Sequence, residues 1–277
     1  MKKILVPCNF STCCDNAVAF AVELAAISNG EVIILTILNL PEITSDAKEF
    51  DKQRKEAHAG FDRIKKNYPI TNLRHVVSTG KKLPAILEYI NRGNIDLVVM
   101  GTKGSRGWQQ IFMGSNAEKV VRTSPVPVFS IKGPTAVRSI KNIVLPCDLR
   151  HCESAFVEKV KGLQRHFRAR LHLLHVNTNA GKEDSSLIPR LKTYATQHGL
   201  DQVTLNVRLG HDEREEIIHF AKEIHADMIA MQTHGNLDME HLFAASIAAD
   251  VVNHAPLPTW TCAVSTKTKL SQIDQPA

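Results

Sequence analysis

The second half of this 277-residue chain repeats the first, so its fold must contain two copies of one unit. The opening stretch Lys3-Ile-Leu-Val-Pro-Cys-Asn9 returns as Asn142-Ile-Val-Leu-Pro-Cys-Asp148. Two later stretches each return 131 positions further on (96 to 227 and 124 to 255). The first, Asp96-Leu-Val-Val-Met-Gly-Thr-Lys-Gly104, returns as Asp227-Met-Ile-Ala-Met-Gln-Thr-His-Gly235. The second, Ser124-Pro-Val-Pro127, returns as Ala255-Pro-Leu-Pro258. Matches in the same order predict a duplicated domain.

The repeat also predicts the domain boundaries. We expect a first domain over residues 1–132 and a second over 139–265, joined by the short segment Lys132-Gly-Pro-Thr-Ala-Val-Arg138. Residues 266–277 are polar and form a tail. The length suits two domains that each bury a core of their own.

Apolar runs and helical patterns alternate along each copy. Ile4–Pro7 and Glu31–Leu38 read as buried strands, and Ala17–Ala26 and Asp46–Lys66 as helices. This alternation is typical of a parallel α/β sheet with helices on both faces. We therefore expect two tandem, open, parallel five-stranded sheets of a Rossmann-like kind.

Composition excludes several classes of function. The formal net charge is +6, aromatic residues make up 5%, and no run of five Lys or Arg occurs, which disfavours nucleic-acid binding. No apolar run approaches the ~20 residues of a membrane span, and the N-terminus lacks a signal peptide. We expect a cytoplasmic protein with reduced cysteines, and no metal site, because no CxxC or His spacing supports one.

A glycine-bearing stretch from Gly101 to Ser115 is the strongest functional signal. It follows the apolar run Leu97–Met100 and leads into a helical segment. Glycines let backbone N–H groups approach an anion closely, and the N-terminus of a helix attracts negative charge. The chain lacks GxxxxGK[ST] and GxGxxG, so the stretch is neither a P-loop nor a standard dinucleotide site.

The spacing resembles a known family signature. Gly101, Gly104, Gly114 and Ser115 match the G-x2-G-x9-G-(S/T) pattern of ATP-binding universal stress proteins, and both copies keep that family's opening strand. The resemblance implies an adenine nucleotide alpha hydrolase-like fold with the nucleotide at the carboxyl ends of strands one and four. It also implies that the fifth strands pair within the chain as a pseudo-dimer, while a further homodimer stays open.

The resemblance implies the ligand and its contacts. The ligand would be ATP, or AMP or ADP. Adenine and ribose would lie near Pro7, Cys8, Asn9, Ile37, Met100 and Gly101, and the phosphates near Gly104, Arg106, Gly114, Ser115 and Asn116. Two of these have ordinary alternatives: Arg106 could be a solvated loop residue, and Ser115 could cap its own helix with Glu118.

Each copy departs from the family pattern at a different place. Asn9 stands where the family usually has Asp, and an amide is a poor Mg²⁺ ligand, so Mg²⁺ dependence is in doubt. The second copy keeps the acid as Asp148, but Gln232 and Ala245 replace two of the glycines. We expect the second site to be closed or to take another ligand.

These observations lead to a nucleotide-binding regulatory protein of stress adaptation, with its site in the first domain. No general base or Ser/His/Asp triad is evident, so we expect at most slow ATP hydrolysis. One alternative is a nucleotide-free scaffold that acts through protein contacts. Another is an ATP-using enzyme, which would need a second acid or base near the glycine loop.

Overall fold

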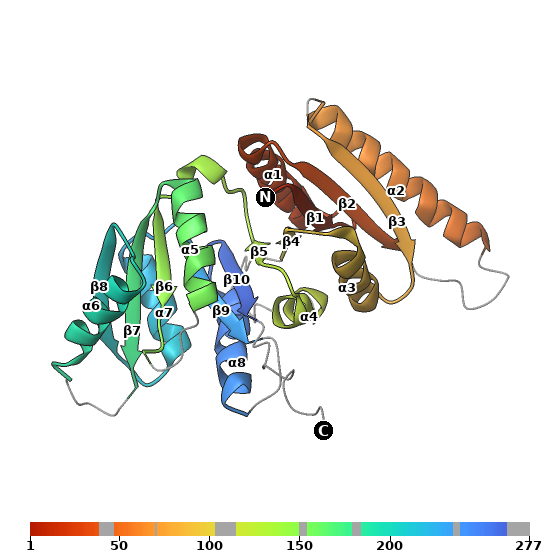
Figure 1. Ribbon diagram of the computed structural model, residues 1–277. Helices are drawn as coiled ribbons and strands as arrows, with labels where there is room; N and C mark the ends of the chain where they lie inside the picture. The colour runs from red at the N-terminus through yellow and green to blue at the C-terminus, as the bar shows by residue number, and fades with distance from the viewer. Residues whose placement is uncertain are drawn as a thin grey trace, which may run out of the picture.

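The computed structural model describes residues 1–38, 47–69, 71–102, 115–149, 154–178, 184–234 and 239–264. Strands and helices alternate along both halves, as the sequence predicts (Figure 1). The first half contains β1 (Lys3–Pro7), α1 (Thr12–Ser28), β2 (Glu31–Leu38), α2 (Ala47–Asn67), β3 (Leu73–Thr79), α3 (Lys82–Gly93), β4 (Leu97–Gly101), α4 (Ser115–Thr123) and β5 (Val128–Ile131).

A short 3-10 helix, η2 (Val137–Ser139), lies between the halves. The second half contains β6 (Asn142–Pro146), α5 (Ser154–Phe167), β7 (Arg170–Asn177), α6 (Leu187–Gln197), β8 (Val203–Leu209), α7 (Glu213–Glu223), β9 (Met228–His234), α8 (Met239–His254) and β10 (Thr259–Val264). Within the described ranges, no helix has both the length and the apolar character needed to cross a membrane.

The described strands form one ten-stranded sheet in the order β3-β2-β1-β4-β5-β10-β9-β6-β7-β8. All neighbours are parallel except β5 and β10, which pair antiparallel with Phe129 opposite Trp260. The expected α/β class is therefore confirmed. The two expected sheets are joined into one, through the pairing of fifth strands that the family resemblance implied.

Helices cover both faces of the sheet. Side chains of α1, α2, α5 and α6 share one continuous core with the strands. On the opposite face, α3 and α4 cover the first half, while α7 and α8 cover the second. The arrangement explains why most strands are apolar along their whole length, since both faces of a parallel sheet are buried.

The repeated Asp has a structural role in each half. Asp96 Oδ2 accepts the backbone N–H groups of Lys2 and Lys3, at 2.6 and 3.0 Å. Asp227 Oδ2 does the same for Lys141 and Asn142, at 2.8 and 2.9 Å. The carboxylate satisfies two donors where the first strand of each unit begins, so the motif repeats because the local hydrogen bonding repeats.

The core crosses the seam between the halves. Phe129 of β5 is fully buried and packs on Phe20 of α1, with ring centroids 5.0 Å apart, and on Phe167 of α5 at 6.3 Å. Its partner Trp260 packs on Phe156 at 6.0 Å. Helices from both halves thus bury their aromatic side chains against the one pair of strands.

A lysine at the end of β5 adds a polar contact across the seam. Lys132 Nζ donates to the backbone oxygen of Asn253, in the last turn of α8, at 2.6 Å. Burial lowers the pKa of Lys132 to about 8, because the charged ammonium loses its hydration there. The carbonyl at the C-terminal end of the helix is a favourable acceptor for this cation.

Shortening the side chain of Phe129, where the two halves meet, should destabilise the whole chain. We expect Phe129→Ala to lower the free energy of unfolding by about 3–5 kcal/mol, because a fully buried ring is replaced by a cavity. Ile27→Ala, at a side chain of α1 that is 58% exposed, is the matched control and should stay within about 0.5 kcal/mol. Guanidinium denaturation measures both, and equal losses would contradict a core shared across the seam.

Candidate functional site

A pocket of about 340 Å³ lies where β1 and β4 end. These strands are neighbours, and the strand order reverses between them: β1 continues outward to β2, and β4 to β5. In open α/β sheets such a switch point leaves a crevice at the carboxyl ends of the strands. The pocket is lined by Pro7, Cys8, Asn9, Ser11, Cys13, Cys14, Leu35, Ile37, Lys82, Ile86, Met100, Gly101, Thr102 and Ala117.

The structure brings six of the sequence-predicted site residues into this one pocket. They come from three separate strands or the turns after them: Pro7, Cys8, Asn9, Ile37, Met100 and Gly101. All six are the residues assigned from the sequence to adenine and ribose. Their role in binding a ligand stays a prediction.

The predicted phosphate contacts are placed only in part. Gly104, Arg106 and Gly114 lie outside the described residues. Ser115 and Asn116 form the beginning of α4, and the next residue, Ala117, lines the pocket. The first turn of α4 therefore reaches the pocket, and the contacts of Ser115 and Asn116 with phosphate stay predictions.

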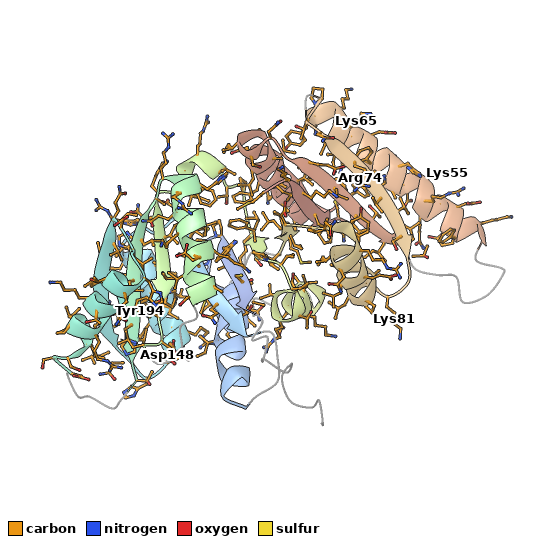
Figure 2. The ribbon with its side chains drawn as sticks, viewed as in Figure 1. Lys55, Lys65, Arg74, Lys81, Asp148 and Tyr194 are labelled. Carbon is orange, nitrogen blue, oxygen red and sulfur yellow. The ribbon has the colours of Figure 1, made fainter. Side chains whose placement is uncertain are left out.

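The structure adds a cation that the sequence analysis missed. Lys82 is exposed, begins α3, and lines the pocket. The only signal was the pair Lys81-Lys82 after Gly80, in the turn between β3 and α3. Nothing in that turn indicates which strand ends it will approach, because the approach depends on how α3 packs on the sheet. Figure 2 shows Lys81, its neighbour, pointing outward from the same turn.

Gly101 is needed for packing as well as for access. A Cβ at this position would lie 2.0 Å from the carbonyl oxygen of Cys13, in the first turn of α1. Side chains do not tolerate contacts of this length, so α1 can approach β4 only over a glycine. In the second copy the equivalent residue of β9 is Gln232, half-buried, 131 positions on (101 to 232).

Asn9 contacts the start of α1. Its Oδ1 accepts the backbone N–H of Ser11 at 3.3 Å and the thiol of Cys14 at 3.1 Å. Its own backbone N–H lies 3.4 Å from Cys14 Sγ. The residue that replaces the family's usual Asp is thus engaged with a cysteine.

The two buried thiols of the pocket have opposite pKa shifts. The pKa of Cys14 is lowered to about 6, chiefly because the thiol of Cys8 hydrogen-bonds to it and the N–H of Asn9 and the hydroxyl of Ser11 add to this. The pKa of Cys8 is raised by its hydrogen bond to Cys14 and by burial. The negative charge of the pair therefore resides on Cys14.

The second half has different contacts at the corresponding strand end. Asp148, which is labelled in Figure 2, lies just after β6. The backbone oxygen of the preceding residue, Cys147, lies 2.9 Å from His175 Nδ1. His172, nearer the start of β7, hydrogen-bonds with Thr204 Oγ1 at 2.8 Å and with Asn142 Oδ1 at 3.2 Å. Both histidines of β7 are thus hydrogen-bonded parts of the fold.

Two further observations concern the surroundings of the pocket. Glu118, in the first turn of α4, forms an ion pair with Arg122 at 3.1 Å, and its capping of Ser115 stays a prediction. Among the residues that the structure describes, no group of three His, Cys, Asp or Glu side chains could hold a metal ion.

The duplicated switch-point sheet with its pocket defines a tandem, doubly wound α/β protein. The model of the universal stress protein family matches residues 1–132 and 139–262, so the chain belongs to this family, in a two-domain arrangement.

Known proteins resemble the chain over one copy or both. Two universal stress proteins of Methanocaldococcus jannaschii are 27% identical over 141 residues (48% of this chain, 83% of theirs) and 24% identical over 153 residues (47% and 94%). A universal stress protein of Archaeoglobus fulgidus has a similar crystal structure, with a TM-score of 0.78, 20% identity, and coverage of 94% of this chain and 98% of its own. That likeness concerns the fold alone.

Adding a methyl group at Gly101 should weaken the fold. We expect Gly101→Ala to cost about 1–3 kcal/mol of unfolding free energy, because α1 must move away from β4 to relieve the clash. Gly133→Ala is the matched control: a Cβ there meets nothing within 4 Å, so stability should change little. Denaturant titration of both variants provides the measurement. An unchanged midpoint for Gly101→Ala would show that α1 does not approach β4 so closely.

Proposed function

We propose that the first half binds an adenine nucleotide in the pocket between β1 and β4, and that this binding makes the protein a regulator in stress adaptation. The observation that carries the proposal is the convergence, on one pocket at the switch point, of the six residues that the family resemblance assigns to adenine and ribose. The glycine signature of ATP-binding family members leads from that pocket into α4.

The chemistry of the wall suits such a ligand. Leu35, Ile86 and Met100 are buried, and with the half-buried Ile37 they offer an apolar surface of the kind that contacts a base. Lys82 and the start of α4, which also border the pocket, offer positive charge to phosphate groups. A pocket lined by both apolar and cationic groups favours a nucleotide over a wholly apolar ligand.

Binding, rather than turnover, is the function proposed. The acidic residue that the family usually carries after the first strand is Asn9, whose carboxamide oxygen faces Ser11 and Cys14. An amide neither accepts a proton from water nor ligates Mg²⁺ well. Affinity for ATP should therefore be the same with Mg²⁺ as with a chelator.

Calorimetry on the purified chain tests the proposal. We expect heat of binding when ATP is added up to about 1 mM, a level that detects interactions of roughly −4 kcal/mol or stronger. AMP and ADP serve as comparisons for the part played by the phosphates. No heat with any of the three would overturn the proposal and leave the scaffold, acting through protein contacts, as the function.

The same substitution at equivalent positions of the two copies locates the site. Gly104 and Gly235 are related by the 131-residue offset (104 to 235). We expect Gly104→Val to abolish ATP binding, because a side chain would occupy the place of a phosphate, while Gly235→Val leaves the affinity unchanged. Gly114→Val should behave like Gly104→Val. Equal losses from Gly104→Val and Gly235→Val would contradict a single site in the first half.

A further inference from the structure

We propose that Cys8 and Cys14 form a thiol pair on the pocket wall that hydroperoxides oxidise reversibly to a disulfide. Both side chains line the pocket, and each is otherwise buried, at 5% and 6% exposure. A small oxidant therefore reaches them through the pocket and not from the general surface.

The local backbone brings the two sulfurs together. Cys8 follows β1 and Cys14 lies in the first turn of α1. Asn9, the residue next to Cys8, contacts Cys14 Sγ through its backbone N–H at 3.4 Å and its Oδ1 at 3.1 Å, so the two sulfurs lie close together. Between them Phe10 has a φ of 58°, in the left-handed region, so the chain turns back on itself within a few residues. The N–H of Phe10 points at Cys8 Sγ, at 3.3 Å. The pair thus needs no large movement of secondary structure to meet.

Several donors stabilise a negative charge on Cys14. The N–H of Asn9 lies 3.4 Å from its sulfur, and the hydroxyl of Ser11 lies 3.7 Å away. Ser11 is the N-cap residue of α1, yet its side chain makes no capping hydrogen bond to the helix. Position in the first turn of a helix adds a favourable dipole. Thiolate character of this kind marks the cysteine that attacks the oxidant.

The surrounding charges favour the same assignment. The neighbouring Cys14 and burial raise the pKa of Cys8, and the charge of Asp15 adds a smaller effect, so Cys8 stays a thiol while Cys14 carries the charge. Arg63 of α2 lies 3.8 Å from Asp15 Oδ1, and Lys82 of α3 lines the same pocket. The ring of Phe10 packs on His75 of β3, with centroids 6.1 Å apart, and burial lowers the pKa of that histidine, which keeps it neutral.

This arrangement explains why an amide suits position nine. An aspartate would place a second negative charge 3.1 Å from Cys14 Sγ, where Asn9 Oδ1 now lies. The carboxamide is neutral, and it can offer its oxygen to a thiol or its NH₂ group to a thiolate. The departure from the family pattern and the cysteine pair are therefore two parts of one site.

The second copy supplies an internal comparison. Cys147 repeats Cys8 and Asp148 stands opposite Asn9, each 139 positions on (8 to 147, 9 to 148). The position that repeats Cys14 is Glu153 (14 to 153). The copy with an acid at the strand end thus keeps the counterpart of Cys13, as Cys152, but has no cysteine at the position of Cys14. The copy with the cysteine pair lacks the acid.

The reaction balances with a hydroperoxide as the oxidant. The Cys14 thiolate attacks the distal peroxide oxygen, the O–O bond breaks, and the leaving alkoxide or hydroxide takes up a proton, so that Cys14 becomes a sulfenic acid. The Cys8 sulfur then forms the S–S bond, and the sulfenic oxygen leaves as water with the thiol proton. Two electrons pass from the pair to the peroxide, and an external thiol restores the reduced state.

Peptide mapping of the full chain tests the pair without any nucleotide. The reduced protein is treated with hydrogen peroxide, alkylated and digested. Trypsin leaves all three N-terminal cysteines in the peptide of residues 4–48, and chymotrypsin then cleaves after Phe10, between Cys8 and Cys14. In a Cys13→Ser background we expect the two fragments to remain linked until a reductant is added. Fragments that stay separate would overturn the proposal.

Single variants assign the roles. Cys8→Ser should trap the sulfenic acid on Cys14, detected with dimedone, because the resolving thiol is missing. Cys14→Ser should abolish both products. Cys147, buried like Cys8 at 6% exposure, is the internal control and should remain unoxidised. Labelling of Cys147 or Cys262 as fast as Cys14 would mean unfolding or indiscriminate oxidation, and would contradict a built site.

A pH profile separates thiolate stabilisation from mere exposure. The rate of Cys14 alkylation by iodoacetamide should rise through an inflection near pH 6, the pKa lowered by its donors, and level off above it. Asn9→Asp should move the inflection to higher pH, since the added carboxylate disfavours the thiolate. An inflection above pH 8 in the wild type, or no shift in Asn9→Asp, would sink the proposed role of these contacts.

A consequence for the pocket follows, and it rests on the proposed function. A Cys8–Cys14 disulfide alters the wall assigned to adenine and ribose, so oxidised Cys13→Ser protein should bind ATP more weakly than the reduced form, and a reductant should reverse the loss. Gly104→Val should oxidise normally while binding no ATP. Oxidation without any ATP binding in the wild type would therefore reject the nucleotide and keep the thiol pair.

Discussion

The antiparallel pairing of β5 with β10 is the contact on which the rest of the molecule depends. Each five-stranded half would otherwise end in an open edge with unpaired N–H and C=O groups. Pairing them inside one chain satisfies those groups and buries Phe129 and Trp260, around which helices of both halves pack. The pairing also separates the two switch points, at β1 and β4 and at β6 and β9, because β5 and β10 lie between them. The residues around one switch point can therefore change while the other keeps its pocket.

That separation accounts for the divergence of the copies. In the first half, Gly101 lets α1 approach β4, and this approach brings the first turn of α1, with Cys13 and Cys14, to the pocket. In the second half, the corresponding strand carries Gln232. The packing of one helix thus decides which side chains the pocket can present.

Much of the fold could be predicted from the sequence. The repeat and the alternation of strands and helices were expected, because they are recorded in the order and periodicity of local residues. The pairing of the fifth strands was expected only from the family resemblance that the glycine spacing carries. The helix Ala47–Asn67 lies within one residue of its expected position, Asp46–Lys66. The contact of Lys82 with the pocket was not predicted, since it depends on how α3 packs on strands that are distant in the sequence.

The sequence by itself determined the two copies, their class of fold and the six positions that meet at the strand ends. Only the tertiary structure decided that Asn9, next to Cys8, hydrogen-bonds to Cys14 and so brings the two cysteines together in the pocket. In the sequence, Cys14 is a helix residue beside another cysteine, with nothing to distinguish the two. The distinction arises because a turn with positive φ at Phe10 returns the chain on itself, and a helix rotates successive side chains by about 100°, so Cys14 is the one whose sulfur contacts Asn9.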